Sequence, residues 1–218
     1  MAVYSVKEMF YTLQGEGAQA GRPAIFCRFS GCNLWTGREQ DRASADCRFC
    51  DTDFIGTDGV DGGKFRSADA LADAITGLWP SAEVPCFVVI TGGEPALQLD
   101  EALVTALHQR GCVIAIETNG TLPLPAAIDW VCISPKQGNE VVLRECDELK
   151  VVYPQQGIDP ADYLHIQAQR YYISPENDPH AAELSLLGTS RYQEAIDYCL
   201  QHPQWRLNLQ QHKVLNIA

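Results

Sequence analysis

Three unequally spaced cysteines are the residues of this sequence best suited to metal chemistry. Fourteen residues separate Cys32 from Cys47, and Cys47 and Cys50 form a C-x-x-C turn with Phe49 beside Cys50. Such a turn can place two thiolates on one metal centre, and a third cysteine from an adjoining loop completes a tripod. Four cysteines would close a structural zinc site or a ferredoxin-like cluster. Three leave one position of a four-iron cluster open for a ligand that is not protein.

The composition narrows the class of protein. The 218 residues suffice for one sizeable core, so we expect one domain over residues 1–218. With 46% hydrophobic and 20% charged residues and no long apolar run, the chain is typical of a globular protein. A formal net charge of −12 argues against nucleic-acid binding. The N-terminal residues lack a signal-peptide pattern, so we expect a cytoplasmic protein whose clustered cysteines bind a metal or cluster.

Apolar runs and amphipathic stretches alternate along the chain. Residues 87–90 form a continuous apolar run that suits a parallel strand buried on both faces. Ser67 is a candidate N-cap for a helix over 70–78, and Gly111 is a candidate C-cap for a helix over 99–110. Strands are expected at 1–10, 24–31, 87–90, 113–116, 130–133, 148–153, 170–173 and 205–209, and helices at 70–78, 99–110 and 192–202. This alternation predicts an α/β fold, either a parallel sheet or a partial barrel.

The remaining segments are expected to be loops. Residues 11–17 carry Gln14 and, between two glycines, Glu16, and residues 56–64 are an exposed turn region. The polar interior of the cysteine segment, 37–46, allows only a short surface helix. The buried face of the last helix is expected to consist of Ala195, Ile196, Cys199 and Leu200.

Four of the expected strands end in a polar or glycine-rich cluster. These clusters are Thr-Gly-Gly-Glu-Pro at 91–95, Glu-Thr-Asn-Gly at 117–120, Ser-Pro-Lys at 134–136 and Ser-Pro-Glu-Asn at 174–177. In parallel α/β folds the ligand sits at the carboxyl ends of the strands. The four clusters and the cysteine loop are therefore expected to face one site.

These motifs resemble those of radical S-adenosylmethionine (SAM) enzymes and, within them, the 7-carboxy-7-deazaguanine synthase family. The resemblance rests on Tyr-Thr-Leu-Gln-Gly-Glu-Gly at 11–17, the three cysteines with Phe49, and the clusters at 91–95, 117–120 and 134–136. Most radical SAM enzymes carry C-x3-C-x2-C, whereas a branch of this family has the C-x14-C-x2-C spacing found here. The resemblance implies an incomplete parallel β/α barrel, formed by a single domain with an enlarged cluster loop at about 32–53.

The resemblance also implies the cofactors. Cys32, Cys47 and Cys50 would bind a [4Fe–4S] cluster whose fourth iron takes SAM, and one electron would then cleave SAM to a 5′-deoxyadenosyl radical. Gly92 and Gly93 would leave room for the methionine part of SAM, and Glu94 would accept from its ammonium group. The implied SAM contacts are Phe49, Cys50, Asp51, Gly92, Gly93, Glu94, Glu117, Asn119, Ser134, Pro135, Lys136, Ser174, Pro175, Glu176 and Asn177.

The implied reaction converts 6-carboxy-5,6,7,8-tetrahydropterin to 7-carboxy-7-deazaguanine with loss of ammonia, in queuosine biosynthesis. SAM would be regenerated. Arg28 would pair with the substrate carboxylate through its bidentate fork. The implied substrate contacts are Leu13, Gln14, Gly15, Glu16, Arg28, Thr91 and Ala218. Thr52 would be the protein ligand of a Mg²⁺ ion. The resemblance further implies that a flavodoxin or ferredoxin supplies electrons and that the protein is a homodimer.

Two other readings compete with this interpretation. A non-enzymatic zinc module would explain three cysteines but not the four polar strand ends. A radical SAM activase that acts on a protein glycine would lack the Gln14–Glu16 loop and would carry further ferredoxin-like cysteines. Five other cysteines lie in apolar patterns and are expected in the core: Cys27, Cys86, Cys112, Cys132 and Cys199. Cys146 lies in a polar stretch and has no assigned role.

Overall fold

A mixed β-sheet runs through the computed structural model, which describes residues 3–155, 157–176 and 190–217. Within these residues the sheet has nine strands in the order β3-β1-β2-β4-β5-β6-β7-β8-β9. Neighbouring strands from β2 to β9 are parallel, whereas β1 is antiparallel to both β2 and β3. The strands are β1 (Tyr4–Leu13), β2 (Pro23–Phe29), β3 (Gly63–Phe65), β4 (Phe87–Gly92), β5 (Val113–Thr118), β6 (Trp130–Ile133), β7 (Glu145–Tyr153), β8 (Gln167–Pro175) and β9 (Trp205–Leu207). The expected α/β architecture is confirmed.

Two capped helices cover the first strands of the sheet. In α1 (Ala68–Gly77) the Ser67 side chain accepts from the backbone N–H of Ala70, as the sequence predicts. Helix α2 (Glu101–Gln109) begins two residues later than predicted, because Asp100 caps it. The apolar faces of both helices pack with β1, β2, β4 and β5 in one core. This burial fixes the strands whose carboxyl ends carry the polar clusters.

The second part of the sheet has its own core, under α3 (Ser190–Gln201). Tyr192 and Ala195 are the buried residues of α3, whereas Leu200 is 77% exposed. The prediction that Leu200 belongs to the buried face is therefore wrong. Its error was one of helical phase, since Tyr192 and Ala195 set the inward direction.

Strand β1 is shifted along the chain relative to its predicted range, and β4, β5, β7 and β8 are longer than the sequence predicts. Strand β1 continues to Leu13, because that residue still pairs with Pro23 of β2. Strand β7 begins at Glu145, and β8 ends only at Pro175, since the two strands pair along their whole length. In the cysteine loop, the expected short surface helix is the 3-10 helix η2 (Glu39–Ser44). Residues 63 and 64, expected in a turn, begin strand β3.

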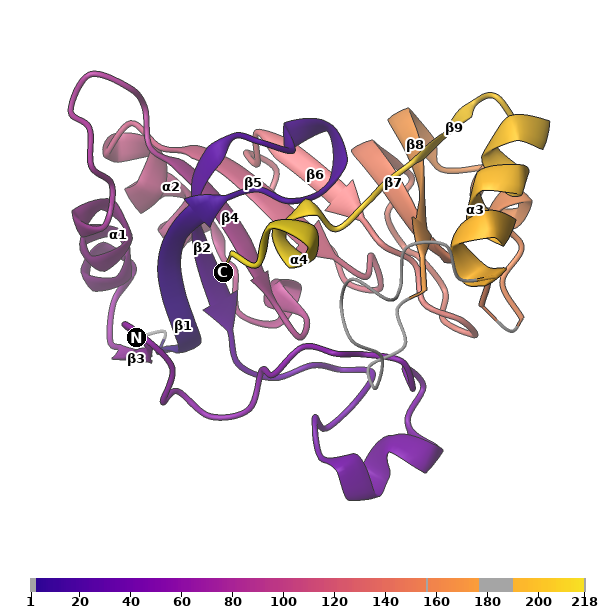
Figure 1. Cartoon of the computed structure of the whole chain (residues 1–218). Coiled ribbons are helices and arrows are strands. Elements are labelled where there is room, and N and C mark those ends of the chain that lie inside the picture. Colours follow the sequence, from indigo (N-terminus) through magenta and orange to yellow (C-terminus); the bar gives the residue numbers. More distant parts are fainter. Residues whose placement is uncertain (1–2, 156, 177–189, 218) are drawn as a thin grey trace.

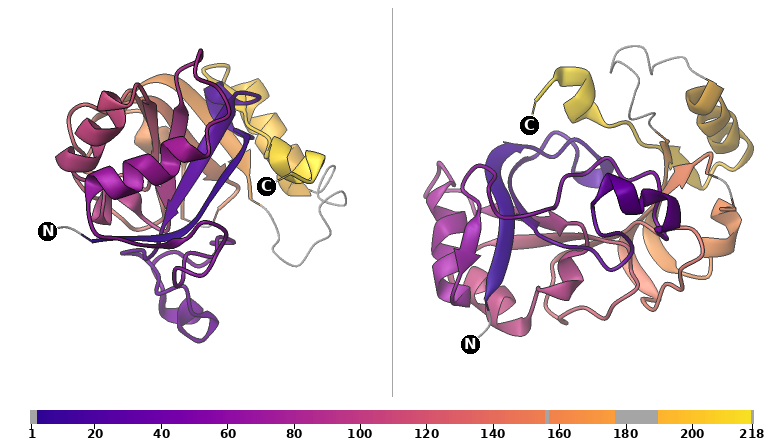
Figure 2. Two further views of the ribbon diagram at one scale, coloured as in Figure 1. Left: turned by 90° about the vertical axis from the view of Figure 1, so that its left-hand side faces the viewer. Right: turned by 90° about the horizontal axis from the view of Figure 1, so that it is seen from below.

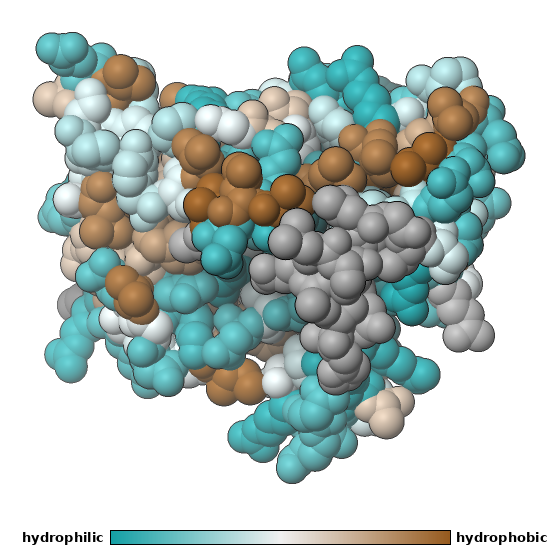
Figure 3. Space-filling view, in the orientation of Figure 1, coloured by the Kyte–Doolittle hydropathy of each residue, from teal (hydrophilic) through white to brown (hydrophobic). Residues whose placement is uncertain are grey.

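Helix α4 (Gln211–Leu215), in the tail, was not predicted from the sequence. Unlike a helix that packs on the core, α4 turns polar side chains inward and apolar side chains outward. His212 and Lys213 face the pocket described below, while Val214 and Leu215 are exposed. Apolar side chains accordingly lie over α4 on the face shown in Figure 3. A search for an inward apolar stripe therefore overlooks this helix.

The arrangement of these elements leaves one end of the sheet for function. In Figure 1 the cysteine loop projects beyond the carboxyl ends of β2 and β4. Helices α1 and α2 lie on one side of the sheet and α4 on the other, as the left view of Figure 2 shows. No helix among the described residues is long and apolar enough to cross a membrane.

Candidate active site

A pocket of about 470 Å³ lies at the carboxyl ends of the parallel strands. Strands β1, β2, β4, β5, β7 and β8 contribute to its wall, together with the segment after β6, the cysteine loop and the tail. Most residues singled out in the sequence meet there. They are Leu13, Gln14, Gly15, Glu16, Arg28, Cys32, Cys47, Phe49, Cys50, Asp51, Thr52, Thr91, Gly92, Gly93, Glu117, Asn119, Ser134, Lys136, Ser174 and Pro175.

The three motif cysteines lie on one rim of the pocket. Cys47 donates to the Cys50 sulfur, and this contact lowers the pKa of Cys50 to about 6 while it raises the pKa of Cys47. Burial raises the pKa of the Cys32 thiol. Within the described part of the chain, no group of three His, Cys, Asp or Glu side chains surrounds a single metal-ion position. Three soft thiols on one wall are a donor set that suits an iron–sulfur cluster.

The turn after β4 supports Cys32. A Cβ on Gly93 would lie 2.4 Å from the carbonyl oxygen of Gly31 and 2.6 Å from the Cβ of Cys32. The backbone N–H of Glu94 donates to the same Gly31 carbonyl at 3.0 Å. The cysteine loop itself therefore occupies the space beside Gly93 that the sequence interpretation left for SAM.

Glu94 is turned away from the pocket and is 0% exposed. Its Oε1 accepts from the Ala96 N–H at 2.9 Å and from the Thr118 hydroxyl at 2.7 Å. Its Oε2 accepts from the Asn119 N–H at 2.7 Å. Burial raises the pKa of this carboxyl, although the three donors oppose that shift. Glu94 thus joins the ends of β4 and β5 and does not reach the pocket as expected.

Asn119 extends this support into the cysteine loop. Its amide donates to the Asn33 side chain at 3.0 Å, and Asn33 in turn donates to the Thr121 hydroxyl at 2.8 Å. Asn33 directly follows Cys32 in the sequence. The Glu-Thr-Asn-Gly cluster therefore holds the loop at the residue after Cys32, whereas Gly93 and Glu94 contact Gly31 before it.

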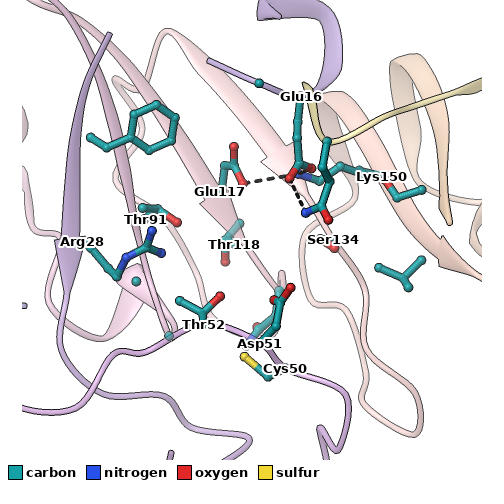
Figure 4. A pocket seen from close by; sticks show the side chains of 18 of the residues that line it. Glu16, Arg28, Cys50, Asp51, Thr52, Thr91, Glu117, Thr118, Ser134 and Lys150 are labelled. Atoms are coloured by element: carbon teal, nitrogen blue, oxygen red, sulfur yellow. Dashed lines mark hydrogen bonds and ion pairs between the residues drawn. The ribbon is translucent and has the colours of Figure 1, made fainter. Parts of the chain in front are cut away.

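A charged cluster forms the opposite wall of the pocket. Lys150, in the middle of β7, lies 2.6 Å from Glu16 and 3.3 Å from Glu117, and Gln14 donates to Glu117 at 3.0 Å. The side chain of Lys150 is 8% exposed and that of Glu16 is 13% exposed. Figure 4 shows Glu16, Glu117 and Lys150 converging, with Cys50 at the lower edge.

These ion pairs dominate the electrostatics of the wall. Burial alone would lower the pKa of Lys150, yet attraction to Glu117 and Glu16 holds it well above its ordinary value. Burial alone would raise the pKa of Glu16, yet Lys150 and the hydrogen bond from Gln210 hold it at about 2. Glu16 is therefore a carboxylate, and Lys150 an ammonium, throughout the physiological range.

The loop that carries Glu16 is anchored at several further points. Gly17, with φ of +65°, has no room for a Cβ because the Glu148 carboxylate fills that position. Glu148 accepts from the Ala18 N–H at 2.8 Å, and burial raises the pKa of its carboxyl. On its other side, Glu16 accepts from Gln210 at 2.7 Å and from Asn208 at 3.3 Å.

The tail closes over this loop and reaches the cysteine loop. The Gln211 N–H donates to the Gly15 carbonyl at 2.9 Å, and a Cβ on Gly15 would overlap His212. Burial lowers the pKa of His212. Lys213 forms an ion pair with Asp51, the residue that follows Cys50. Helix α4 thus bridges the two sides of the pocket.

Arg28, Thr91 and Thr52 form a separate polar group, seen on the left of the cluster in Figure 4. Arg28 on β2 pairs with Thr91 on β4 in the sheet register. Its Nε donates to Glu8 at 2.8 Å, and no residue in the described part of the chain pairs with the terminal nitrogens of the guanidinium. Thr52 adjoins this group two residues after Cys50.

Ser134 and Lys136 follow β6 on the wall between these groups. Lys136 donates to the Ser134 hydroxyl at 2.8 Å. Its ammonium group lies 5.8 Å from the centre of the Phe49 ring, which joins the C-x-x-C turn to the Ser-Pro-Lys cluster. The pairing keeps a cation beside the cysteines.

The structure does not bring every predicted residue to the pocket. Of the described residues, Glu94, Pro135 and Glu176 do not line it, and Glu176 instead pairs with Arg191 at 2.6 Å. Asn177 and Ala218 lie outside the described residues. The sequence interpretation also missed several lining residues: Lys7, Glu8, Phe10, Phe26, Leu34, Asp53, Thr118, Lys150, Val152, Gln210, His212 and Lys213. For Lys150 a signal existed, because a lysine inside an otherwise apolar strand requires a buried partner.

An α/β sheet with three cysteines and buried charges around a pocket at its carboxyl edge is the arrangement of an enzyme. No family model matches the chain. It is, however, 58% identical to the 7-carboxy-7-deazaguanine synthase of Burkholderia multivorans over 214 residues, which cover 98% of this chain and 99% of the relative. The 7-carboxy-7-deazaguanine synthase of Bacteroides thetaiotaomicron is 38% identical over 212 residues, which cover 97% of this chain and 97% of the relative.

A solved structure agrees with these relatives. The crystal structure of QueE from Escherichia coli superposes with a TM-score of 0.71 and 27% identity, covering 96% of this chain and 95% of that one. The chain therefore belongs to the 7-carboxy-7-deazaguanine synthase family, and it is an enzyme of that family.

Proposed function

We propose that this protein converts 6-carboxy-5,6,7,8-tetrahydropterin to 7-carboxy-7-deazaguanine with loss of ammonia, as a radical SAM enzyme of 7-deazapurine (queuosine) biosynthesis. Family membership supports the reaction. The observation that carries it for this chain is the meeting of three thiols, the polar strand ends and the Glu16 loop in one pocket. A ring contraction by hydrogen abstraction requires cofactor and substrate side by side, shielded from water.

Cys32, Cys47 and Cys50 would hold a [4Fe–4S] cluster. The donor set fits, because three thiols share one rim and the supports described above fix Cys32 from two sides. When bound, the cluster and SAM supply the one-electron chemistry that abstracts a hydrogen atom. The chain contributes the geometry: Gly93 and Asn119 hold the loop, and the buried wall limits the access of water.

SAM would lie between the cysteines and the ends of β5, β6 and β8. Lys136, held beside Ser134, would bind its carboxylate, and the backbone around Phe49 would meet the adenine. Glu117, Asn119, Ser174 and Pro175 border the same space, at the ends of two further strands. Glu94 has no part in this assignment, since its carboxylate is occupied.

The substrate would lie between the charged cluster and Arg28. The pterin edge carries N–H donors, which match the backbone and side chains of Gln14 and Glu16. Arg28 and Thr91, on adjacent strands, would bind the substrate carboxylate through the free guanidinium nitrogens. The Thr52 hydroxyl would be the protein ligand of Mg²⁺ there, since magnesium sites keep few protein ligands.

Five wider expectations belong to the same proposal. We infer that the sheet is the incomplete barrel of the radical SAM type and that the chain forms one domain, which the continuous sheet supports. A homodimer and a flavodoxin or ferredoxin donor are further predictions from the family. We also predict that the reaction takes place in the cytoplasm.

The test is anaerobic reconstitution with iron and sulfide, followed by reaction with SAM, a reductant, Mg²⁺ and the carboxytetrahydropterin. Ultraviolet absorbance and mass report the deazaguanine acid. We expect product from the wild type and none from Cys47→Ala. Formation of 5′-deoxyadenosine without the acid would contradict the substrate assignment, and zinc in place of a cluster would contradict the chemistry.

A further inference from the structure

The Asn208 side chain, directly after β9, connects the loop that carries Glu16 to the end of β8 from beneath the pocket wall. It is 4% exposed, and every polar atom of its carboxamide has a partner. The Oδ1 accepts from the Gly17 N–H at 2.7 Å, while Nδ2 donates to the Ser174 hydroxyl at 2.9 Å and to Glu16 at 3.3 Å. Its backbone N–H donates to the Ile173 carbonyl at 2.8 Å. These contacts fix the orientation of the amide.

We propose that Asn208 is a positioning residue that sets the distance between the substrate loop and the SAM-side end of β8. This inference rests on the proposed function, in which Glu16 borders the substrate and Ser174 borders SAM. Asn208 itself does not line the pocket, so it acts through those two residues. A displacement of about 1 Å at a reacting centre lowers rates by about a hundredfold, so such a tie matters for hydrogen transfer.

The other anchors of the loop do not perform this task. Ala18 and Lys150 tie it to β7, and Gln210 ties it to the tail. Asn208 contacts the loop and β8 with the same amide group. Its replacement should therefore leave the loop folded but free to shift relative to Ser174.

Asn208→Asp is the sharpest change, because it keeps the shape and the acceptor for Gly17. It replaces the donor by an oxygen that faces the Glu16 carboxylate and repels it. Gln169→Glu is the matched control: Gln169 lies on the same strand as Ser174 and donates to Asp147 at 2.7 Å, but it is exposed and distant from the pocket. Both variants place an acid against an acid.

The measurement compares the yield of 7-carboxy-7-deazaguanine with that of 5′-deoxyadenosine, which accumulates only when SAM cleavage is uncoupled from turnover. For Asn208→Asp we expect the product-to-deoxyadenosine ratio to fall about ten- to a hundredfold, as for the loss of a hydrogen bond to a charged group. The KM for the pterin should rise, and the iron content should be unchanged. Gln169→Glu should behave as the wild type.

Asn208→Ser, which is too short to reach Ser174, serves as a second variant if the first fails to fold, and thermal melting checks both. A product-to-deoxyadenosine ratio equal to that of the wild type would overturn the proposal. If kcat alone fell, with this ratio and the KM for the pterin unchanged, the role of Asn208 would be merely structural. If the wild type itself makes no deazaguanine product, the proposed function fails instead, so the two failures are distinguishable.

Discussion

The turn after β4 and the turn after β1 are both glycine–glutamate segments that border the same pocket, and they differ in what surrounds the carboxylate. After β4, Glu94 accepts from three neutral donors, the Ala96 N–H just beyond it and two groups at the end of β5, and burial raises its pKa. After β1, Glu16 accepts from the ammonium of Lys150 and from two amides of the tail, and its pKa is about 2. The first turn supports the cysteine loop; the second presents charge to the pocket.

The difference shows that a motif does not by itself reveal which way its acid points. Both segments place a glutamate after a glycine at the end of a strand. The neighbours decide: Thr118 and Asn119 turn Glu94 inward, whereas Lys150 draws Glu16 towards the pocket. Four predictions test this contrast, from the largest effect to the smallest.

Lys150→Met should have the largest effect, because it leaves Glu16 and Glu117 without their buried cation. Removal of one partner from a buried ion pair destabilises a protein by about 3–5 kcal/mol. Denaturant unfolding at neutral pH should show a loss of this order, together with loss of pterin turnover. Lys7→Met is the control for the unfolding measurement alone, since the carboxylates that pair with Lys7 are exposed. An equal loss in both variants would contradict the account.

The two glutamates should respond differently to acid. The pKa of Glu16 is lowered from 4.5 to about 2, so its contribution is present above a pH of about 4.5 and is lost as the pH falls towards 2. This contribution is about 3 kcal/mol at most. Glu16→Gln should flatten the acid limb of the unfolding free energy against pH. Glu94→Gln removes an acid of raised pKa and should leave the acid limb of the unfolding free energy as steep as in the wild type. If Glu94→Gln flattened this limb and Glu16→Gln did not, Glu94 and not Glu16 would be the glutamate of lowered pKa.

An added methyl group should separate the roles of the two turns. Gly93→Ala drives a Cβ against Gly31 and Cys32, whereas Gly15→Ala drives one against His212. Each should destabilise the fold by about 1–3 kcal/mol through overpacking. Reconstituted Gly93→Ala should bind less iron per chain, while Gly15→Ala should keep its iron and show a higher KM for the pterin. Iron loss in both variants would mean that the two turns are not independent.

Lys213→Met should have the smallest effect. Its ion pair with Asp51 is partly exposed, and such pairs contribute less than about 1 kcal/mol. We expect KM values to change by no more than about fivefold at low salt, and the difference to vanish as ionic strength rises. A large effect that persists in high salt would instead make α4 an essential part of the site.

The sequence was most informative where local signals and burial agree. The strand at 87–90 and the helix after Ser67 follow from apolar periodicity and a cap, and both elements are found there, the strand continuing to Gly92. The cluster motifs also indicated correctly that the strand ends and the cysteine loop meet in one pocket. These features depend on neighbours in the sequence or on the general geometry of parallel sheets.

The remaining features depend on partners far away in the chain. Asn208 and Gln210 meet Glu16 across more than 190 residues, and no local pattern marks them. Helix α4 exposes Val214 and Leu215, so apolar periodicity points away from the side that matters. The inward turn of Glu94 follows from its bonds to β5, which only the folded register reveals.

The most direct test of the central claim follows one hydrogen atom. The reconstituted enzyme would be given 6-carboxytetrahydropterin with deuterium at C6, together with SAM, Mg²⁺ and a reductant, and SAM would be recovered for mass analysis. If the pocket joins cofactor and substrate for hydrogen abstraction at C6, deuterium appears in the recovered SAM. Product formation with SAM that stays unlabelled would contradict the account.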